Sequence, residues 1–192
     1  MKIGILALQG DFHEHQNCFN KLNVETQLVK SLSEFENCDS LVIPGGESTA
    51  ISKLLISTKI DRAIAEKASE GFPIWGTCAG LILISNQIIE NDPDPLKLIN
   101  ITTSRNFYGR QIDSFVEKIL FENENFEAIF IRAPKIVSTE KDIEILSSTH
   151  DGTPVAVKSK NILGTSFHPE LTDDLRIHKM FLDMTKINNF KK

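Results

Sequence analysis

The sequence predicts an α/β fold in which a central, mixed but mostly parallel sheet carries helices on both faces. In the first half of the chain, short apolar runs alternate with segments of helical periodicity, and this alternation favours a parallel sheet. A Gly-x-Cys-x-Gly turn follows one apolar run, as in strand–turn–helix architectures. The 192 residues are 41% hydrophobic and 24% charged, an ordinary globular composition. We therefore expect one domain spanning residues 1–192.

Four apolar runs in the first half are predicted strands: Lys2–Leu8, Val24–Val29, Ser40–Ile43 and Ile74–Trp75. Helical spacing predicts helices near residues 15–22, 51–55 and 60–68, the last ended by Gly71. We expect Asp11 to cap the first helix. On the same helix we expect Cys18 to pack in the core, and His13 and His15 to be surface or cap residues rather than ligands.

The stretch Gly76-Thr77-Cys78-Ala79-Gly80 is a candidate nucleophile turn. Such a turn lifts a side chain to the carboxyl end of a sheet, and Gly76 and Gly80 leave the space that it needs. At the first turn of the following helix, unpaired N–H groups and the helix dipole favour a thiolate. A lone cysteine among apolar residues is also typical of simple packing, so catalysis requires a partner base.

The partner base is predicted at His168-Pro169-Glu170. On an extended segment, residues two apart share a face, and Pro169 favours that conformation. Glu170 can then accept a hydrogen bond from Nδ1–H of His168, which leaves Nε2 to serve Cys78. The three residues form a predicted nucleophile–base–orienter triad for acyl transfer. A turn with incidental charge is the alternative interpretation of His-Pro-Glu.

Acyl transfer produces an oxyanion that needs N–H donors. The residue after the nucleophile, Ala79, is one predicted donor. The second is predicted at Gly46, in the glycine-rich stretch Pro44–Thr49 that ends the third strand. An ordinary tight turn, with Ser48 as the cap of the next helix, would explain the same residues.

The second half of the chain predicts a more antiparallel region of the same sheet, after a loop at residues 91–95. Its predicted strands are Leu96–Thr103, Gln111–Leu120, Phe126–Ile131, Ile143–Ser148, Thr153–Lys158 and Asn161–Gly164. Thr172 is the predicted N-cap of a last helix whose apolar face includes Ile177, Phe181 and Met184.

Composition narrows the functional class. The net charge is −5 and no basic run exceeds Lys191-Lys192, which argues against nucleic acid as a partner. No apolar stretch reaches the roughly 20 residues that a membrane span needs, and the amino terminus lacks a signal-peptide pattern. The three cysteines form no Cys-x-x-Cys pair, which argues against zinc and disulfides. We expect a cytoplasmic protein with no metal and no cofactor.

Taken together, the nucleophile turn and the His-Pro-Glu motif resemble those of the class I, triad-type glutamine amidotransferases. Further stretches resemble one branch of these enzymes, the glutaminase subunits of pyridoxal 5′-phosphate synthase. These stretches are Leu8–Asp11, Pro44–Thr49, Arg105–Gln111, Asp113–Phe115, Ile131–Pro134 and Ser166–Leu171. The resemblance covers nearly the whole chain. One departure is Ser104, where the family often has an acidic residue before the Arg-Asn pair.

The resemblance implies a flavodoxin-like, three-layer fold and a defined reaction. L-glutamine would be hydrolysed to L-glutamate and ammonia through a thioester on Cys78. A synthase subunit, in a hetero-oligomeric complex, would combine the ammonia with a pentose phosphate and a triose phosphate to make pyridoxal 5′-phosphate. Six positions match the glutamine-contacting residues of the family: Gly46, Glu47, Ser48, Arg105, Ile131 and Arg132. A bidentate clamp by Arg105 on the substrate carboxylate suits this role, although surface salt bridging is its ordinary alternative.

Two other functions fit parts of the pattern. A different cysteine hydrolase on a similar sheet would act on γ-glutamyl or ester substrates. A redox-sensing or chaperone-like α/β protein would have a reactive Cys78 but would not need His168, so the His-Pro-Glu motif argues against it.

Overall fold

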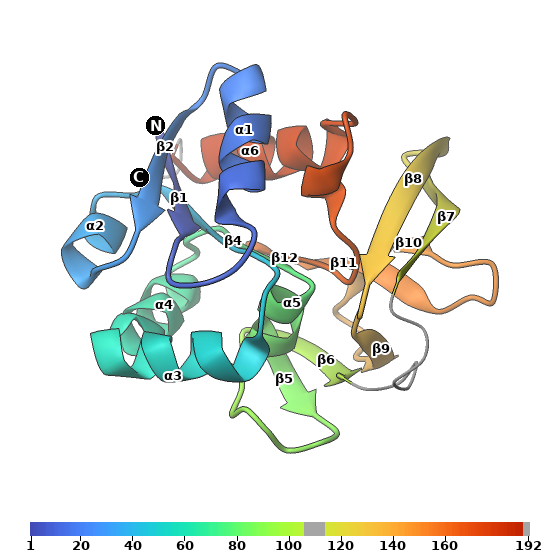
Figure 1. Cartoon of the computed structure of the whole chain (residues 1–192), viewed down its shortest axis with the longest axis horizontal. Coiled ribbons are helices and arrows are strands. Elements are labelled where there is room, and N and C mark those ends of the chain that lie inside the picture. The colour runs from blue at the N-terminus through green and yellow to red at the C-terminus, as the bar shows by residue number, and fades with distance from the viewer. Residues whose placement is uncertain (106–113, 190–192) are drawn as a thin grey trace.

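A seven-stranded sheet forms the centre of the protein (Figure 1). The structure is a computed structural model and describes residues 1–105 and 114–189. Across the sheet the strands are β10 (Glu144–Ser148), β11 (Pro154–Ser159), β12 (Ile162–Thr165), β4 (Ile74–Thr77), β3 (Ser40–Ile43), β1 (Lys2–Leu6) and β2 (Glu25–Val29). From β12 to β2 all neighbours pair in parallel, whereas β11 pairs antiparallel with both β10 and β12. The predicted mixed, mostly parallel sheet is confirmed.

Alternate side chains of the central strands supply two separate cores, one on each face of the sheet. Val42 and Trp75 belong to one core, while their neighbours Leu41 and Ile74 belong to the other. Helices α1 (Phe12–Lys21) and α6 (Arg176–Asn189) cover the first face. Helices α2 (Leu32–Glu36), α3 (Ser48–Thr58), α4 (Ile60–Ser69) and α5 (Ala79–Ile84) contribute to the second core (Figure 1). The result is the expected three-layer arrangement.

Five strands do not join the central sheet. β5 (Ser85–Ile88), β6 (Ile99–Ser104) and β9 (Lys135–Thr139) form a small sheet of their own. β7 (Ser114–Phe121) and β8 (Glu124–Ile131) form a two-stranded ribbon. Three of these strands, β6, β7 and β8, were predicted to belong to the central sheet, and β5 and β9 were not predicted as strands. The hydrophobic pattern could not assign them, because a strand that buries one face looks the same in any sheet.

Several predicted boundaries also change. The helix predicted after Cys78 is confirmed as α5, which ends at Ile84, and the chain then continues as β5, which was not predicted. The last helix begins at Arg176, because the Thr172 hydroxyl caps a preceding turn by accepting from the Asp174 N–H at 3.2 Å. Residues 111–113, where one strand was predicted to begin, and residues 106–111 of the Arg-Asn motif lie outside the described residues.

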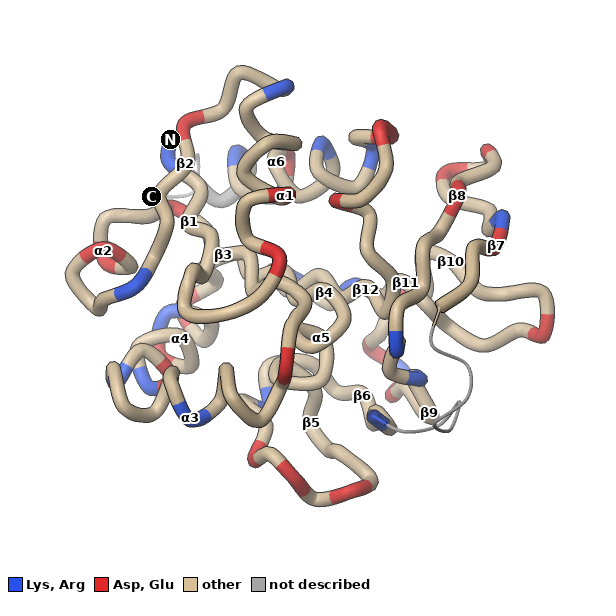
Figure 2. Tube along the Cα trace, in the orientation of Figure 1, with Lys and Arg blue, Asp and Glu red and all other residues tan. Residues whose placement is uncertain are grey.

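Charged side chains of both signs are spread over the elements (Figure 2). The loop between β5 and β6 is acidic and carries Glu90, Asp92 and Asp94. Within residues 1–105 and 114–189, no helix has the length and apolar character required to cross a bilayer.

The carboxyl ends of four neighbouring strands converge at one edge of the sheet. The register pairs Thr165 of β12 with Thr77 of β4, and Ile43 of β3 with Gly76 of β4. The loops that follow β1, β3, β4 and β12 therefore emerge side by side. In open α/β sheets, this edge is where ligands bind.

Candidate active site

Cys78 occupies a strained turn between β4 and α5. Its backbone has φ +48° and ψ −104°, which a residue with a Cβ rarely adopts, and its N–H donates to the Thr165 carbonyl at 2.9 Å. The turn packs tightly, since a Cβ on Gly80 would collide with the backbone of Ile43. This is the strand–turn–helix predicted from the glycine spacing. The helix that follows Cys78, α5, has only six residues, and the Cys78 side chain bonds the neighbouring His168.

His168 and Glu170 form a short buried pair. His168 Nδ1 lies 2.7 Å from Glu170 Oε1, and the two residues are 3% and 5% exposed. Glu170 lies in a 3₁₀ turn, Pro169–Leu171, so the predicted extended segment is wrong although the predicted pair forms. A proline ring fits the first position of a helical turn as well as an extended chain, which explains both results.

The surroundings of His168 favour its protonated form. Burial by itself lowers the pKa of this imidazole, but hydrogen bonds to Cys78 and Glu170, together with attraction to both groups, raise it to about 10. Burial raises the pKa of the Glu170 carboxyl, and the hydrogen bond from His168 opposes that effect. A nearly dry site therefore contains a sulfur, an imidazole and a carboxylate in contact, which suits a thiolate–imidazolium pair.

The other two cysteines differ from Cys78. Burial raises the pKa of the Cys18 and Cys38 thiols to about 11 each, so both are protonated at neutral pH. Cys18 is 2% exposed, as predicted for core packing, and its sulfur lies 3.7 Å from the Glu170 carbonyl oxygen.

The glycine-rich loop after β3 is held by the loop after β1. The Gly45 carbonyl accepts from the Asp11 N–H at 3.1 Å, and the Gln9 side chain accepts from the Glu47 N–H at 2.8 Å. Gly46 has φ +155°, a backbone conformation that L side chains rarely adopt. The two loops therefore fix the orientation of the Gly45–Gly46 peptide in this structure.

Asp11 lies at the N-cap position of α1, but its side chain makes no capping hydrogen bond. Instead, its carboxylate lies 3.8 Å from His168 Nδ1, and burial raises its pKa. Attraction to His168 opposes that increase. The predicted cap is thus a neighbour of the triad.

Glu47 and Arg105, both predicted to contact glutamine, contact each other across 3.2 Å. Glu47 also caps α3 by accepting from the Thr49 and Ala50 N–H groups, so the N-cap is Glu47 and not Ser48. The Arg105 guanidinium donates to the Asp92 carbonyl at 2.7 Å. The Glu90 carboxylate accepts from the Arg105 N–H and from the Ser104 hydroxyl.

Ile131 and Arg132 lie where β8 ends, next to the nucleophile. The Ile131 carbonyl oxygen is 3.8 Å from Cys78 Sγ, and Arg132 has φ +43°. A hydrogen bond of 2.8 Å from the His168 N–H to the Ile129 carbonyl ties this strand to the triad segment. Of the predicted site residues, Cys78, His168, Glu170 and Ile131 therefore meet directly, while Glu47 and Arg105 form a second pair.

Comparison with known proteins assigns the family. The sequence profile of the SNO glutamine amidotransferase family matches residues 5–187. This chain belongs to that family. It is 48% identical over 189 residues to pyridoxal 5′-phosphate synthase subunit PdxT of Thermotoga petrophila, covering 97% of this chain and 100% of the relative. It is 47% identical to the PdxT subunit of Dictyoglomus turgidum, covering 95% and 97%.

Solved structures agree with this assignment. A crystal structure described as a glutamine amidotransferase superposes with a TM-score of 0.91 at 36% identity, covering 96% of this chain and 98% of that one. PurLQS from Thermotoga maritima superposes with a TM-score of 0.70 at 15% identity, covering 95% and 97%, and supports the fold alone. The class I amidotransferase fold predicted from the sequence is confirmed.

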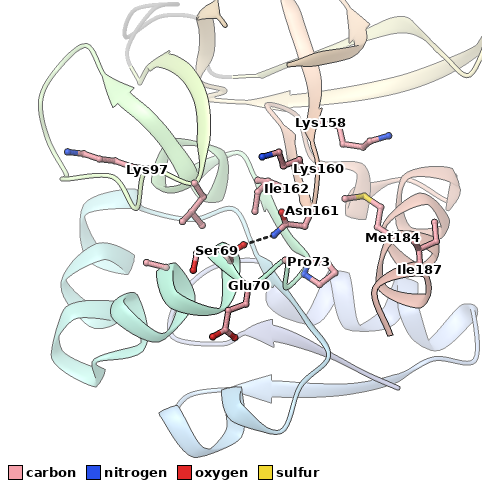
Figure 3. A pocket seen from close by; sticks show the side chains of 14 residues that line it. Ser69, Glu70, Pro73, Lys97, Lys158, Lys160, Asn161, Ile162, Met184 and Ile187 are labelled. Atoms are coloured by element: carbon pink, nitrogen blue, oxygen red, sulfur yellow. Dashed lines mark hydrogen bonds between the residues drawn. The ribbon is translucent and has the colours of Figure 1, made fainter. Parts of the chain in front are cut away.

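A cavity of about 870 Å³ lies elsewhere in this amidotransferase (Figure 3). It adjoins Pro73 and Asn161, which precede β4 and β12, and Lys97, Lys158 and Lys160 surround it. It is therefore at the amino edge of the sheet, whereas Cys78 and His168 follow the carboxyl ends of the same two strands.

Asp11, His168 and Glu170 place one ligand-type atom each within 4.8 Å of one another. Such a cluster has the composition of a cation site, but the 2.7 Å bond between His168 and Glu170 already occupies Nδ1. The absence of a metal stays a prediction.

Sequence reasoning missed two buried histidines. His15, predicted at the surface or a helix cap, is 0% exposed, as is His178 of α6; His13 is exposed. The signal was present, because His15 shares helical spacing with Cys18 and Phe19 on the apolar face of α1.

Proposed function

We propose that this chain is a single-domain glutaminase, residues 1–192, that hydrolyses L-glutamine to L-glutamate and ammonia for pyridoxal 5′-phosphate synthesis. Family membership and the PdxT relatives support the reaction and the pathway. The observation that carries the assignment of roles is the contact of Cys78, His168 and Glu170 at a strained strand–helix turn. Hydrolysis of glutamine by this triad needs no cofactor.

The first half-reaction forms a thioester. The Cys78 thiolate attacks the amide carbon of glutamine and gives a tetrahedral oxyanion. The His168 imidazolium donates its Nε2 proton to the amide nitrogen, and the C–N bond breaks to release ammonia. Glu170, bonded to Nδ1, keeps the ring oriented and stabilises its positive charge.

The second half-reaction restores the enzyme. Neutral His168 takes a proton from water while the oxygen attacks the thioester carbon. The new tetrahedral intermediate expels the Cys78 thiolate and leaves glutamate, whose acid proton passes to solvent. The thiolate–imidazolium pair is then ready for another cycle. We assign the oxyanion contacts in both halves to the N–H groups of Ala79 and Gly46.

We assign glutamine binding to Glu47, Arg105 and the residues around them. Arg105 would exchange its bonds to Glu47 and Asp92 for a bidentate contact with the substrate carboxylate. Glu47 would then receive the substrate ammonium, because its carboxylate is free of the arginine. Gly46, Ser48, Ile131 and Arg132 complete the assigned contacts.

We assign the synthase subunit, in a hetero-oligomeric complex, as the acceptor of ammonia and as an activator. Ammonia released without an acceptor would be protonated and lost. The Asp11 N–H holds the Gly45 carbonyl and the Gln9 side chain holds the N–H of the next peptide, at Glu47, so a partner that docks on residues 8–11 can change the orientation of the Gly45–Gly46 peptide. A peptide that presents its carbonyl loses one oxyanion donor, which costs roughly 3 kcal/mol or more than a hundredfold in rate.

The test measures ammonia release from glutamine by the chain alone and with its synthase subunit, with Cys78→Ala as the control. We expect a rate at least roughly a hundredfold higher in the complex. Equal rates would exclude the activation, and no glutamine hydrolysis in either sample would contradict the glutaminase. A preference for γ-glutamyl peptides over glutamine would support the alternative hydrolase. If Cys78 reacted equally fast in the wild type and in His168→Ala, the redox-sensing alternative would be supported.

A further inference from the structure

Behind the triad, His15 of α1 and His178 of α6 form a pair that is fully buried. His15 Nδ1 lies 3.1 Å from His178 Nε2. On the other side of its ring, His15 Nε2 lies 3.2 Å from the Thr77 hydroxyl and 3.4 Å from Glu170 Oε2. The pair therefore reaches the oxygen of Glu170 that does not bond His168.

That second oxygen needs a partner. Glu170 Oε2 is buried, and within the described residues no group bonds it by ordinary hydrogen-bond geometry. An ionised carboxylate in a dry site is costly unless donors surround it. His15 Nε2 is therefore in the right place to supply the missing donor, provided that it carries the proton.

The proton positions follow from the surroundings. Burial lowers the pKa of His15 well below its usual value and that of His178 to about 3, so each ring is neutral and carries one N–H. If His15 carried its proton on Nδ1, two lone pairs would face each other at Nε2 and Glu170 Oε2. The His178 Nδ1–H would also be buried without an acceptor, because Nδ1 has no partner among the described residues.

The opposite arrangement removes both problems. His178 Nε2–H donates to His15 Nδ1, and His15 then carries its proton on Nε2, 3.2 Å from the Thr77 hydroxyl oxygen and 3.4 Å from Glu170 Oε2. His178 Nδ1 is then an unpaired acceptor, which costs less than an unpaired donor. The rings of Trp75 and Phe19 pack edge-on against His178, with centroids 4.9 and 5.1 Å away.

We propose that His15 is a positioning residue, which donates its Nε2–H to Glu170 Oε2, and that His178 sets the tautomer that makes this possible. The proposal rests on the proposed glutaminase only for its effect on turnover. The chain of contacts runs from α6 through α1 to the triad: His178, His15, Glu170, His168 and Cys78.

The other groups that face Glu170 do not replace this donor. The backbone N–H of Glu170 also bonds its own carboxylate and lowers the pKa of that group, but within the described residues Oε2 still has no hydrogen-bond donor. Cys18 of α1, a protonated thiol, lies near the Glu170 carbonyl and not its carboxylate. Asp11 is a carboxylate and repels Glu170, while His168 bonds the other oxygen. Without His15, Glu170 would therefore hold a proton more readily and support the His168 imidazolium less.

The test compares His15→Leu, which keeps an apolar volume and loses the donor, with His15→Gln, which retains an N–H at similar reach. In complex with the synthase subunit, we expect His15→Leu to lower kcat roughly 10- to 100-fold, as for loss of a hydrogen bond to a charged group, with little change in KM. His15→Gln should recover most of the rate. His178→Leu should have a smaller effect than His15→Leu.

A second measurement does not require glutamine turnover. The rate of Cys78 alkylation by iodoacetamide, followed by mass spectrometry against pH, reports the thiolate fraction. A weaker imidazolium stabilises the thiolate less, so the midpoint should move to higher pH in His15→Leu and return in His15→Gln. Absence of ammonia release by the wild type would refute the glutaminase, while this alkylation profile would still test His15.

Phe19→Leu is the matched control, because it loosens the same ring cluster without removing the donor. We expect it to lower the melting temperature and leave the alkylation midpoint unchanged. An unshifted midpoint in folded His15→Leu, a His15→Gln variant as impaired as His15→Leu, or an equal shift in Phe19→Leu would each overturn the proposal.

Discussion

The two edges of the central sheet contrast. At the carboxyl edge of β4 and β12, polar side chains bond one another: His168 with Glu170, and Glu47 with Arg105. At the amino edge the 870 Å³ cavity is lined by lysines, and its Asn161 amide already donates to the Ala68 and Phe72 carbonyls. This cavity is therefore distant from the predicted triad. Groups that converge and shift one another's pKa mark the site better than volume does.

The largest contrast is expected between two cysteines. Cys78 follows the carboxyl end of β4, whereas Cys38 precedes β3 at the amino edge. Cys78→Ala should lower glutamine hydrolysis by the complex at least roughly ten-thousandfold, because the nucleophile is lost, while Cys38→Ala should retain near-normal turnover. Ammonia release and circular dichroism measure both. A glutamine-analogue electrophile should label Cys78 and neither of the other two cysteines. If Cys78→Ala remained active, the assignment of Cys78 as the nucleophile would be wrong.

The next effect separates the members of the buried pair. His168→Ala should be nearly as damaging as Cys78→Ala, because triad members act as a unit. Glu170→Gln should be milder than His168→Ala, since the amide oxygen can still accept from Nδ1–H and Glu170 orients the ring without transferring the proton. Steady-state kinetics in the complex measure both. Equal losses would reassign Glu170 as a structural anchor.

A smaller effect is expected for substrate binding. Arg105→Ala should raise the KM for glutamine roughly 10- to 100-fold, as expected for loss of a charged contact, with kcat changed only a few-fold. Lys97→Ala, at the amino-edge cavity, is the matched loss of a cation and should leave KM unchanged. A large fall in kcat at saturating glutamine would argue against a pure binding role for Arg105.

The smallest effect concerns the Asp11, His168 and Glu170 cluster. Because His168 and Glu170 bond each other directly, we expect dialysis against a chelator to leave ammonia release unchanged. Assay before and after dialysis, with restoration by added metal as the control, measures this. If ammonia release were lost on dialysis and restored by added metal, the Asp11, His168 and Glu170 cluster would have to be reassigned as a metal site.

Local patterns predicted the contacts among Cys78, His168 and Glu170. The glycines on either side of Cys78 indicate a tightly packed turn. The structure explains the glycine at position 80, because a Cβ there would collide with the backbone of Ile43. The two-residue spacing of His168 and Glu170 predicted their contact even though the backbone is a 3₁₀ turn. The spacing of His168 and Glu170 involves sequence neighbours only, whereas the glycine at position 80 is required by Ile43 of β3.

What the sequence could not predict depends on distant partners. His15 and His178 are 163 positions apart, so nothing local indicates that they form one pair. β5 has a buried–exposed–exposed–buried pattern rather than strict alternation, and its pairing with β6 is irregular. Tertiary contacts, not periodicity, determine such short strands.

The left-handed backbone of Cys78 has a consequence for engineering. A residue with a Cβ at φ +48° costs the fold of order 1–3 kcal/mol, and glycine adopts this conformation freely. Cys78→Gly should therefore melt at a higher temperature than both the wild type and Cys78→Ala, while being catalytically dead. The same backbone strain would therefore oppose the proposed nucleophile in any engineering that selects for thermal stability alone.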